Sequence, residues 1–188
     1  MDIFSRFVVS WMIAFRESAT LAEDLIAETC LKQEIVPGTL TIHADNGSSM
    51  KSVTVGQLLM DLGVTKTHSR PHVSNDNPYS ESAFKTLKYR PDFPDRFGSI
   101  EDARSFCRGF FHWYNMKHRH SGIAMMTPYS VHYGTAEKTL EQRAVVLIQA
   151  YMNHPERFVN GIPSVKTVPR EVWINKPNVK EQVTQSVT

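Results

Sequence analysis

Two acidic residues, Asp45 and Glu81, stand at positions suited to phosphodiester chemistry. Asp45 follows the β-branched run 41–44 and precedes an Asn-Gly turn, which places it at the end of a strand. Glu81 falls in the first turn of a helix that Asn77 and Pro78 are expected to begin. Carboxylates are the hard ligands that Mg²⁺ and Mn²⁺ prefer, and two such ions can clamp the oxygens of a phosphodiester during cleavage.

Each carboxylate also has an ordinary explanation. An Asp before Asn-Gly is a common turn residue, and a Glu in the first helical turn is favoured by the helix dipole. The 35 residues between the two, at positions 46–80, and the residues that flank them resemble the last two carboxylates of the Asp-Asp-Glu transposases and retroviral-type integrases, and this resemblance implies a catalytic and metal-binding pair. We expect Asp45 and Glu81 to meet at one edge of a sheet, within about 10 Å, and to share a divalent ion.

Lys85 and Lys88 follow Glu81 at helical spacings of four and seven, so the three residues share one helix face. Two cations beside a metal-binding carboxylate suit the phosphates of DNA, although surface pairing between Glu81 and Lys85 is the simpler alternative. Phe84 and Leu87 are expected to face the core. His43 lies two residues before Asp45, so it either supports that carboxylate or packs on the strand.

The elements that must position these residues alternate between strand and helix, which indicates an α/β fold. The first half is expected to begin with two strands within 1–15, joined at Ser5-Arg6, and a helix at 18–33. A strand at 39–44, a helix at 52–62 and a strand at 64–68 should follow. A loop at 69–78 should then lead into a helix at 78–90. The second half is expected to contain a long helix after Ser99, a short one from Thr127-Pro128, a helix at 136–152, and an arm that fades into a loose tail by residue 188. We place a domain at 1–135 and a C-terminal helix with its tail at 136–188.

Composition sets broader limits. The chain has 188 residues, 41% of them hydrophobic and 21% charged, which is usual for a soluble globular protein. A net charge of +2 does not by itself indicate a nucleic-acid partner, but eight Lys or Arg against four acids lie between Lys85 and Arg119. Cys30 and Cys107 form no metal-binding spacing and are expected to be buried. No apolar run is long enough to span a membrane.

Several short sequence motifs together resemble those of one family, the transposases of the IS3 group of bacterial insertion sequences, within the integrase core superfamily. Residues 1–11 resemble its second and third strands. His43-Ala44-Asp45-Asn46-Gly47-Ser48 resembles its second catalytic motif, and residues 75–88 resemble its third. The words 113–115, 119–122 and 127–128 resemble its closing signature, while 154–158 and 172–175 resemble the tail of one subgroup.

The resemblance implies an RNase H-like integrase core with a mixed sheet flanked by helices, acting on DNA with Mg²⁺ or Mn²⁺. It implies Asp45 and Glu81 as catalytic residues and metal ligands, and Lys85 and Lys88 as contacts to the DNA end. The implied partners are insertion-sequence ends, target DNA and a further copy or an intact transposase, in the bacterial cytoplasm at the nucleoid.

The family's first catalytic Asp, on its first strand, has no counterpart here, and Asp2 matches a non-catalytic Asp. We therefore expect a fragment without the first strand, inactive alone, from a decayed copy, a frameshift or a late start codon. One alternative is a non-catalytic DNA-binding or dimerising fragment that modulates an intact transposase. Another is a metal-dependent nuclease of the RNase H type, against which the long aromatic helix and the closing signature argue.

Overall fold

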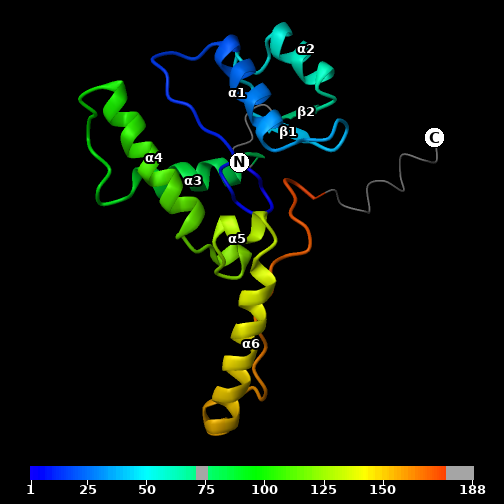
Figure 1. Ribbon diagram of the computed structural model, residues 1–188, viewed down its shortest axis with the longest axis vertical. Helices are drawn as coiled ribbons and strands as arrows, with labels where there is room; N and C mark the ends of the chain where they lie inside the picture. Colours follow the sequence, from blue (N-terminus) through cyan, green and yellow to red (C-terminus); the bar gives the residue numbers. More distant parts are fainter. Residues whose placement is uncertain (71–75, 177–188) are drawn as a thin grey trace, which may run out of the picture. The chain divides into compact units, whose positions relative to one another are not determined.

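The structure, a computed structural model, describes residues 1–70 and 76–176 (Figure 1). This part contains the helices α1 (Ala19–Lys32), α2 (Val53–Asp61), α3 (Pro78–Lys88), α4 (Ile100–Met116), α5 (Pro128–His132) and α6 (Ala136–Asn153), the strands β1 (Thr41–Ala44) and β2 (Thr65–His68), and the short 3₁₀ turns η2 (Ser121–Ile123) and η3 (Pro155–Arg157). The centre of the expected 69–78 loop and the expected loose tail lie outside the described residues.

The chain divides into two compact units. Unit 1 comprises residues 1–9 and 97–171, and unit 2 comprises residues 10–96 and the segment that begins at Val172. The two candidate carboxylates and both lysines belong to unit 2. The sequence-based boundary between residues 135 and 136 falls inside unit 1, within the start of α6.

Unit 2 is built on a β-α-β arrangement. β1 and β2 pair in parallel, with Thr41 opposite Thr65 and Ala44 opposite His68. Parallel neighbours need a crossover connection, and α2 supplies it. The expected strands at 39–44 and 64–68 and the helix between them are thereby confirmed, and the α/β class with them.

The core of unit 2 forms where α1 and α2 pack together beside the strands. Val55, Leu59, Val64 and Cys30 are buried there, and partly buried apolar side chains such as Ile26 and Ile42 surround them. The helix starts were predictable, because Ser18 accepts a hydrogen bond from Leu21 N and Ser52 accepts one from Val55 N. Gly63 ends α2 with φ +64°, where a Cβ would lie 2.8 Å from Pro37 Cβ.

Unit 1 centres on α4, whose apolar stripe is buried as the sequence predicts. Ser99 caps the helix by accepting from Asp102 N, and Cys107, Phe110 and Tyr114 are buried. Burial raises the pKa of Tyr114 to about 12 and also raises the pKa of the Cys107 thiol. Tyr114 is therefore a core residue, and Cys107 is the small buried hydrophobe that its position on the helix indicated.

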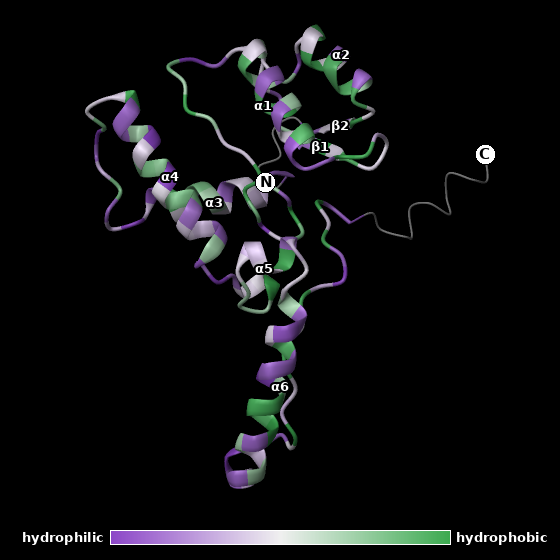
Figure 2. Cartoon of the chain, in the orientation of Figure 1, coloured by the Kyte–Doolittle hydropathy of each residue, from purple (hydrophilic) through white to green (hydrophobic). Residues whose placement is uncertain are grey.

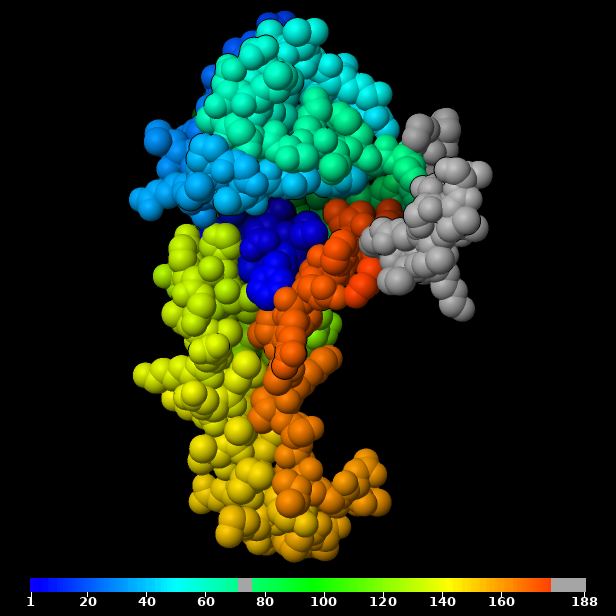
Figure 3. Space-filling view, turned by 90° about the vertical axis from the view of Figure 1, so that its right-hand side faces the viewer, coloured from blue at the N-terminus to red at the C-terminus, as the bar shows by residue number. Residues whose placement is uncertain are grey.

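α6 and the arm that follows it form the other part of unit 1. Figures 1 and 3 both show the arm, in orange, running back alongside α6, in yellow. Tyr151 meets Phe158 edge-on at 5.5 Å, and Val168 packs against the buried cluster of Ile123, Met126 and Ala136. Figure 2 shows hydrophilic and hydrophobic residues mixed along α6, and among the described residues no helix is long and apolar enough to cross a membrane.

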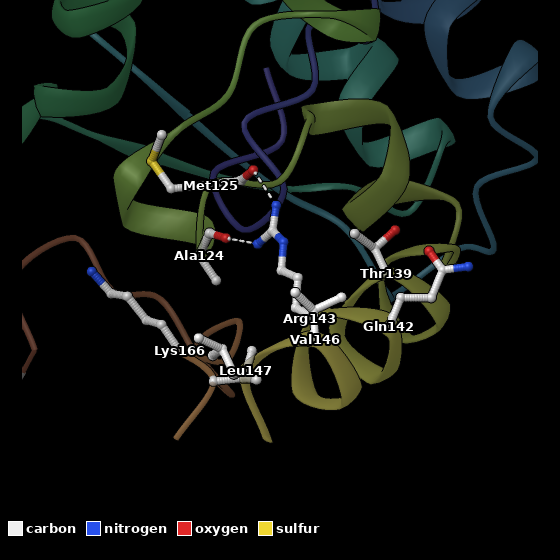
Figure 4. A pocket seen from close by; sticks show the side chains of 9 residues that line it. Ala124, Met125, Thr139, Gln142, Arg143, Val146, Leu147 and Lys166 are labelled. Atoms are coloured by element: carbon white, nitrogen blue, oxygen red, sulfur yellow. Dashed lines mark hydrogen bonds between the residues drawn. The ribbon is translucent and has the colours of Figure 1, made fainter. Parts of the chain in front are cut away.

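A cavity of about 470 Å³ lies against α6, lined mainly by apolar groups that include Val146, Leu147 and Val165. Of its two basic side chains, Arg143 and Lys166, the first is already engaged: Arg143 donates to the carbonyls of Ala124 at 2.6 Å and Met125 at 3.1 Å (Figure 4). Both of these residues have φ +57°, a conformation that costs free energy for residues with a side chain. Arg143 therefore stabilises a strained turn.

The two strands expected within residues 1–15 do not form. Residues 3–5 make a turn that Asp2 closes, accepting from Phe4 N at 2.9 Å and from Ser5 Oγ at 2.5 Å. Asp2 also contacts His132 Nδ1 at 3.0 Å. β-Branched residues favour a strand only when a neighbouring strand is available to pair. At Val8 a side chain, and not a neighbouring strand, binds the backbone N–H and C=O.

That side chain is Asn115 of α4. Its Oδ1 accepts from Val8 N at 2.9 Å, and its Nδ2 donates to Val8 O at 3.0 Å, as a paired strand would. Asn115→Ala leaves the backbone N–H and C=O of the buried residue Val8 unpaired. We therefore expect a loss of about 2–3 kcal/mol in the free energy of unfolding, measured by urea denaturation. Asn153→Ala, at an exposed position, is the control and should change it by less than about 0.5 kcal/mol. Equal effects of the two substitutions would contradict this role for Asn115.

Candidate functional site

Asp45 lies directly after β1, as expected, and its side chain is exposed. Its Oδ1 accepts from Gly47 N at 2.9 Å, and its backbone carbonyl accepts from His68 Nδ1 at 2.9 Å. A Cβ at position 47 would lie 3.0 Å from Asp45 Oδ1, so glycine leaves room for this close turn. Turn and strand together hold the carboxylate, while Oδ2 accepts no hydrogen bond from any described residue.

Glu17 adds a second negative charge near this turn. Its Oε1 lies 3.4 Å from the same Cβ position at residue 47, next to the Asp45 carboxylate. Glu17 and Asp45 are both exposed. Two carboxylates facing one point create a negative potential that favours a cation.

His43 connects the strand of Asp45 to the segment that leads into α3. Its Nδ1 lies 2.9 Å from Thr67 Oγ1 on β2, and its Nε2 lies 3.0 Å from the carbonyl O of Asp76. A carbonyl can only accept, so we assign the proton to Nε2, and Thr67 then donates to Nδ1. His43 therefore contacts the neighbouring strand and the segment that begins α3, whereas no described hydrogen bond joins it to the Asp45 carboxylate.

Glu81 lies in the first turn of α3, where its backbone N–H donates to Asn77 O at 3.1 Å. Glu81, Lys85 and Lys88 are all exposed, which confirms the expected exposure of the two lysines. Within the part of the chain that the structure describes, Glu81 forms no ion pair with either lysine. The three charged groups therefore remain accessible to a ligand.

The prediction that Phe84 turns into the core is wrong, whereas that for Leu87 is confirmed. Phe84 is 57% exposed and Leu87 is 8% exposed. The helical repeat explains the difference: Phe84 stands three residues after Glu81 and four before Lys88, so it lies on the charged face. The exposed face of α3 thus carries one carboxylate, one aromatic ring and two ammonium groups.

Asp76 anchors the start of α3, and the sequence alone did not single it out. It is 2% exposed, and Arg70 grips it with the backbone N at 2.7 Å, Nε at 3.1 Å and Nη2 at 3.0 Å. Hydrogen bonds from the Arg70 side chain, its backbone N–H and Asn175 outweigh desolvation and hold the pKa of Asp76 well below its usual value. The sequence offers one sign of this role, namely that Asp76 is an acidic residue five positions before Glu81.

The donor set suits a divalent ion. Asp45 and Glu81 are exposed carboxylates on anchored segments, and carboxylate oxygens are the preferred ligands of Mg²⁺ and Mn²⁺. In residues 1–70 and 76–176, no group of three His, Cys, Asp or Glu side chains is close enough to hold a metal. That Asp45 and Glu81 share one ion stays a prediction.

The histidines near Arg119 serve packing in unit 1. His118 stacks on Tyr114 with ring centroids 5.5 Å apart, and His120 meets His118 edge-on at 4.3 Å. Burial, His118 and Arg6 lower the pKa of His120 to about 4, so its ring is neutral at pH 7. Arg119 donates to Met125 O at 3.2 Å and thus braces the turn after η2.

Comparisons with known proteins identify similar sequences. Two family models, each described as an integrase core domain, match residues 62–128 and 1–74. The transposase for insertion sequence element IS904 of Lactococcus lactis subsp. lactis (strain IL1403) is 31% identical over 132 residues, which are 68% of this chain and 51% of the relative. The chain thus spans about half the length of that curated relative.

Solved structures of retroviral proteins are also similar. The catalytic core domain of BIV integrase matches with a TM-score of 0.48 and 24% identity, over 72% of this chain and 83% of that one. The simian T-cell lymphotropic virus intasome in complex with PP2A regulatory subunit B56 gamma matches with a TM-score of 0.47 and 14% identity, over 65% and 43%. Together the two family models match residues 1–128, and on this evidence the chain belongs to the integrase core domain family.

Proposed function

We propose that this chain contributes to DNA transposition, as part of a transposase that cleaves insertion-sequence ends and joins them to target DNA. One observation carries the proposal: a single side chain, His43, connects the strand that Asp45 follows to the segment that begins the helix of Glu81. The similarity to an insertion-sequence transposase supports it. We infer that the chain acts in the bacterial cytoplasm on nucleoid DNA, together with further copies or an intact transposase.

In this proposal Asp45 and Glu81 hold Mg²⁺ or Mn²⁺. The bound ions would supply Lewis-acid stabilisation of the attacking and leaving oxygens of a phosphodiester. The chain's own residues orient the carboxylates: Gly47 N–H fixes Asp45 Oδ1, and His43 fixes the backbone before α3. Lys85 and Lys88 follow on the face of Glu81 and would neutralise phosphates next to the cleaved bond.

Divalent-dependent DNA binding tests this proposal. The chain should bind a labelled DNA duplex roughly tenfold more tightly in Mn²⁺ than in EDTA, because an ion on Asp45 and Glu81 replaces carboxylate–phosphate repulsion by a bridge worth about 1.4 kcal/mol. The double variant Asp45→Asn, Glu81→Gln should lose this difference. If the double variant gains as much from Mn²⁺ as the unaltered chain, the proposed site is not where the ion acts.

The two lysines predict a specific salt dependence. Replacing Lys85 and Lys88 by Ala should weaken duplex binding and flatten the slope of log K against log salt by up to about two, one for each lost phosphate contact. The control replaces Lys32 and Lys51, which are also exposed in unit 2, and so removes the same charge. Fluorescence anisotropy between 50 and 200 mM salt, a range of the order used for such slopes, measures both. An identical slope for both double variants would exclude a specific phosphate role for Lys85 and Lys88.

A further inference from the structure

The segment Val172–Asn175 contacts the start of α3, although more than 90 residues separate the two along the chain. Asn175 Nδ2 donates to Asp76 Oδ1 at 2.5 Å, and Tyr79 OH donates to the carbonyl O of Trp173 at 3.2 Å. All four residues belong to unit 2. Asp76 precedes the first helical residue, Pro78, and Tyr79 follows it, so the segment holds both sides of the helix start.

These contacts support a helix start that has no side-chain cap of its own, as is also true of α6. Asn77 occupies the N-cap position, but its side chain accepts no hydrogen bond from the helix. By contrast, a Ser or Thr side chain caps four other helices: Ser18 for α1, Ser52 for α2, Ser99 for α4 and Thr127 for α5. A first turn without a cap frays more readily, and Glu81 lies in that turn.

Asn175 suits this role in both its backbone and its side chain. Its φ of +56° lies in the left-handed region, which Asn tolerates better than most residues with a side chain. Its amide completes the donors around Asp76, whose other partner, Arg70, has a side chain that is 63% exposed. The Asp76 carbonyl in turn accepts from His43, two residues before Asp45. Hydrogen bonds therefore run from Asn175 through Asp76 and His43 to the strand of the other carboxylate.

We propose that Val172–Asn175 is a positioning segment that orients Glu81 relative to Asp45 for metal binding. The inference rests on the proposed function, since it takes these two carboxylates as ligands. Asn175 and the Trp173 carbonyl act through Asp76 and Tyr79 and do not themselves touch the ion. Loss of their contacts frees the first turn of α3, so Glu81 spends less time in the orientation that a shared ion requires.

The test uses the full chain with Asn175→Gly and Tyr79→Phe combined. Glycine keeps the left-handed backbone but removes the amide donor, and phenylalanine removes only the hydroxyl. The controls are Asn160→Gly and Tyr89→Phe, two exposed positions, of which Tyr89 ends α3. Mn²⁺ affinity is measured by electron paramagnetic resonance. Hydrogen exchange is followed at the Glu81 amide and at the amides of α1.

We expect Mn²⁺ affinity to fall roughly three- to tenfold, somewhat less than when a direct partner of a metal ligand is lost. Exchange of the Glu81 amide should accelerate by a similar factor, while α1 exchange and the melting temperature stay unchanged. The controls should behave like the unaltered chain.

Each other outcome has a distinct meaning. Unchanged Mn²⁺ affinity with unchanged Glu81 exchange overturns the positioning role and leaves the proposed function intact. Faster exchange in all elements with a lower melting temperature also overturns it, because the segment then only stabilises the fold. If the unaltered chain binds no Mn²⁺, the proposed function fails and the metal role of the segment fails with it. The Glu81 exchange rate then still shows whether the segment anchors α3.

Discussion

Asp45→Asn is expected to weaken Mn²⁺ binding by roughly a hundredfold or more. Loss of a carboxylate ligand should exceed the 10–100-fold effect that is typical for the loss of a group that only supports a ligand. Glu81→Gln should have a similar effect, because the two carboxylates are proposed to hold the same ion. Electron paramagnetic resonance of free and bound Mn²⁺ gives the dissociation constants.

Asp61→Asn is the matched control for this prediction. Asp61 is an exposed carboxylate at the end of α2 in unit 2, where it accepts from Gln57 Nε2 at 2.9 Å. Its substitution removes the same charge and should leave Mn²⁺ affinity within about twofold. Equal losses for Asp45→Asn and Asp61→Asn would mean that Mn²⁺ senses only the overall charge.

Leu59→Ala is expected to cost about 3 kcal/mol in the free energy of unfolding of unit 2. The side chain is 2% exposed and packs with Cys30, Val55 and Val64, so truncation leaves a cavity beside the strands. Because α2 connects β1 to β2, a loosened core should also weaken the support of Asp45. Urea denaturation followed by circular dichroism measures the loss.

The next residue provides the control for Leu59. Met60 is 75% exposed, and Met60→Ala should change the free energy of unfolding by less than about 0.5 kcal/mol. Comparable losses at residues 59 and 60 would show that α2 does not pack through Leu59.

Local signals predicted much of the fold. Ser99 marked a helix start, and Ser18 and Ser52 were among several candidate caps for α1 and α2, because a serine before an apolar periodic run can accept a hydrogen bond from the first turn. The short runs that became β1 and β2 were recognisable from β-branched residues between turns. These features depend on neighbours within a few residues, which a single sequence contains.

Features that depend on distant contacts were not predictable in the same way. The residues 1–15 have strand-like composition, yet at Val8 the backbone N–H and C=O pair with the side chain of Asn115, 107 positions later. The contact between Asn175 and Asp76 spans 99 positions. Phe84 is a different case, because hydrophobicity suggested burial although its helical spacing from Glu81 and Lys88 already placed it on the charged face.

The candidate site divides in the same manner. The placement of Asp45 after a strand, the placement of Glu81 in a first helical turn and the exposure of Lys85 and Lys88 followed from local sequence signals. The residues that support them, His43, Asp76 and Asn175, act through contacts between segments. The spacing of residues in a sequence can indicate the candidate catalytic residues. Only the folded chain shows which other residues hold those side chains in position.

Paramagnetic broadening by Mn²⁺ tests most directly whether Asp45 and Glu81 share one ion. The amide signals of residues 45–47 and 79–82 should broaden together in a nuclear magnetic resonance titration, with one common midpoint. In Asp45→Asn both sets should lose their broadening at that midpoint, and in Glu81→Gln likewise. Broadening of one set alone, or of the two sets at different Mn²⁺ concentrations, would contradict a shared site.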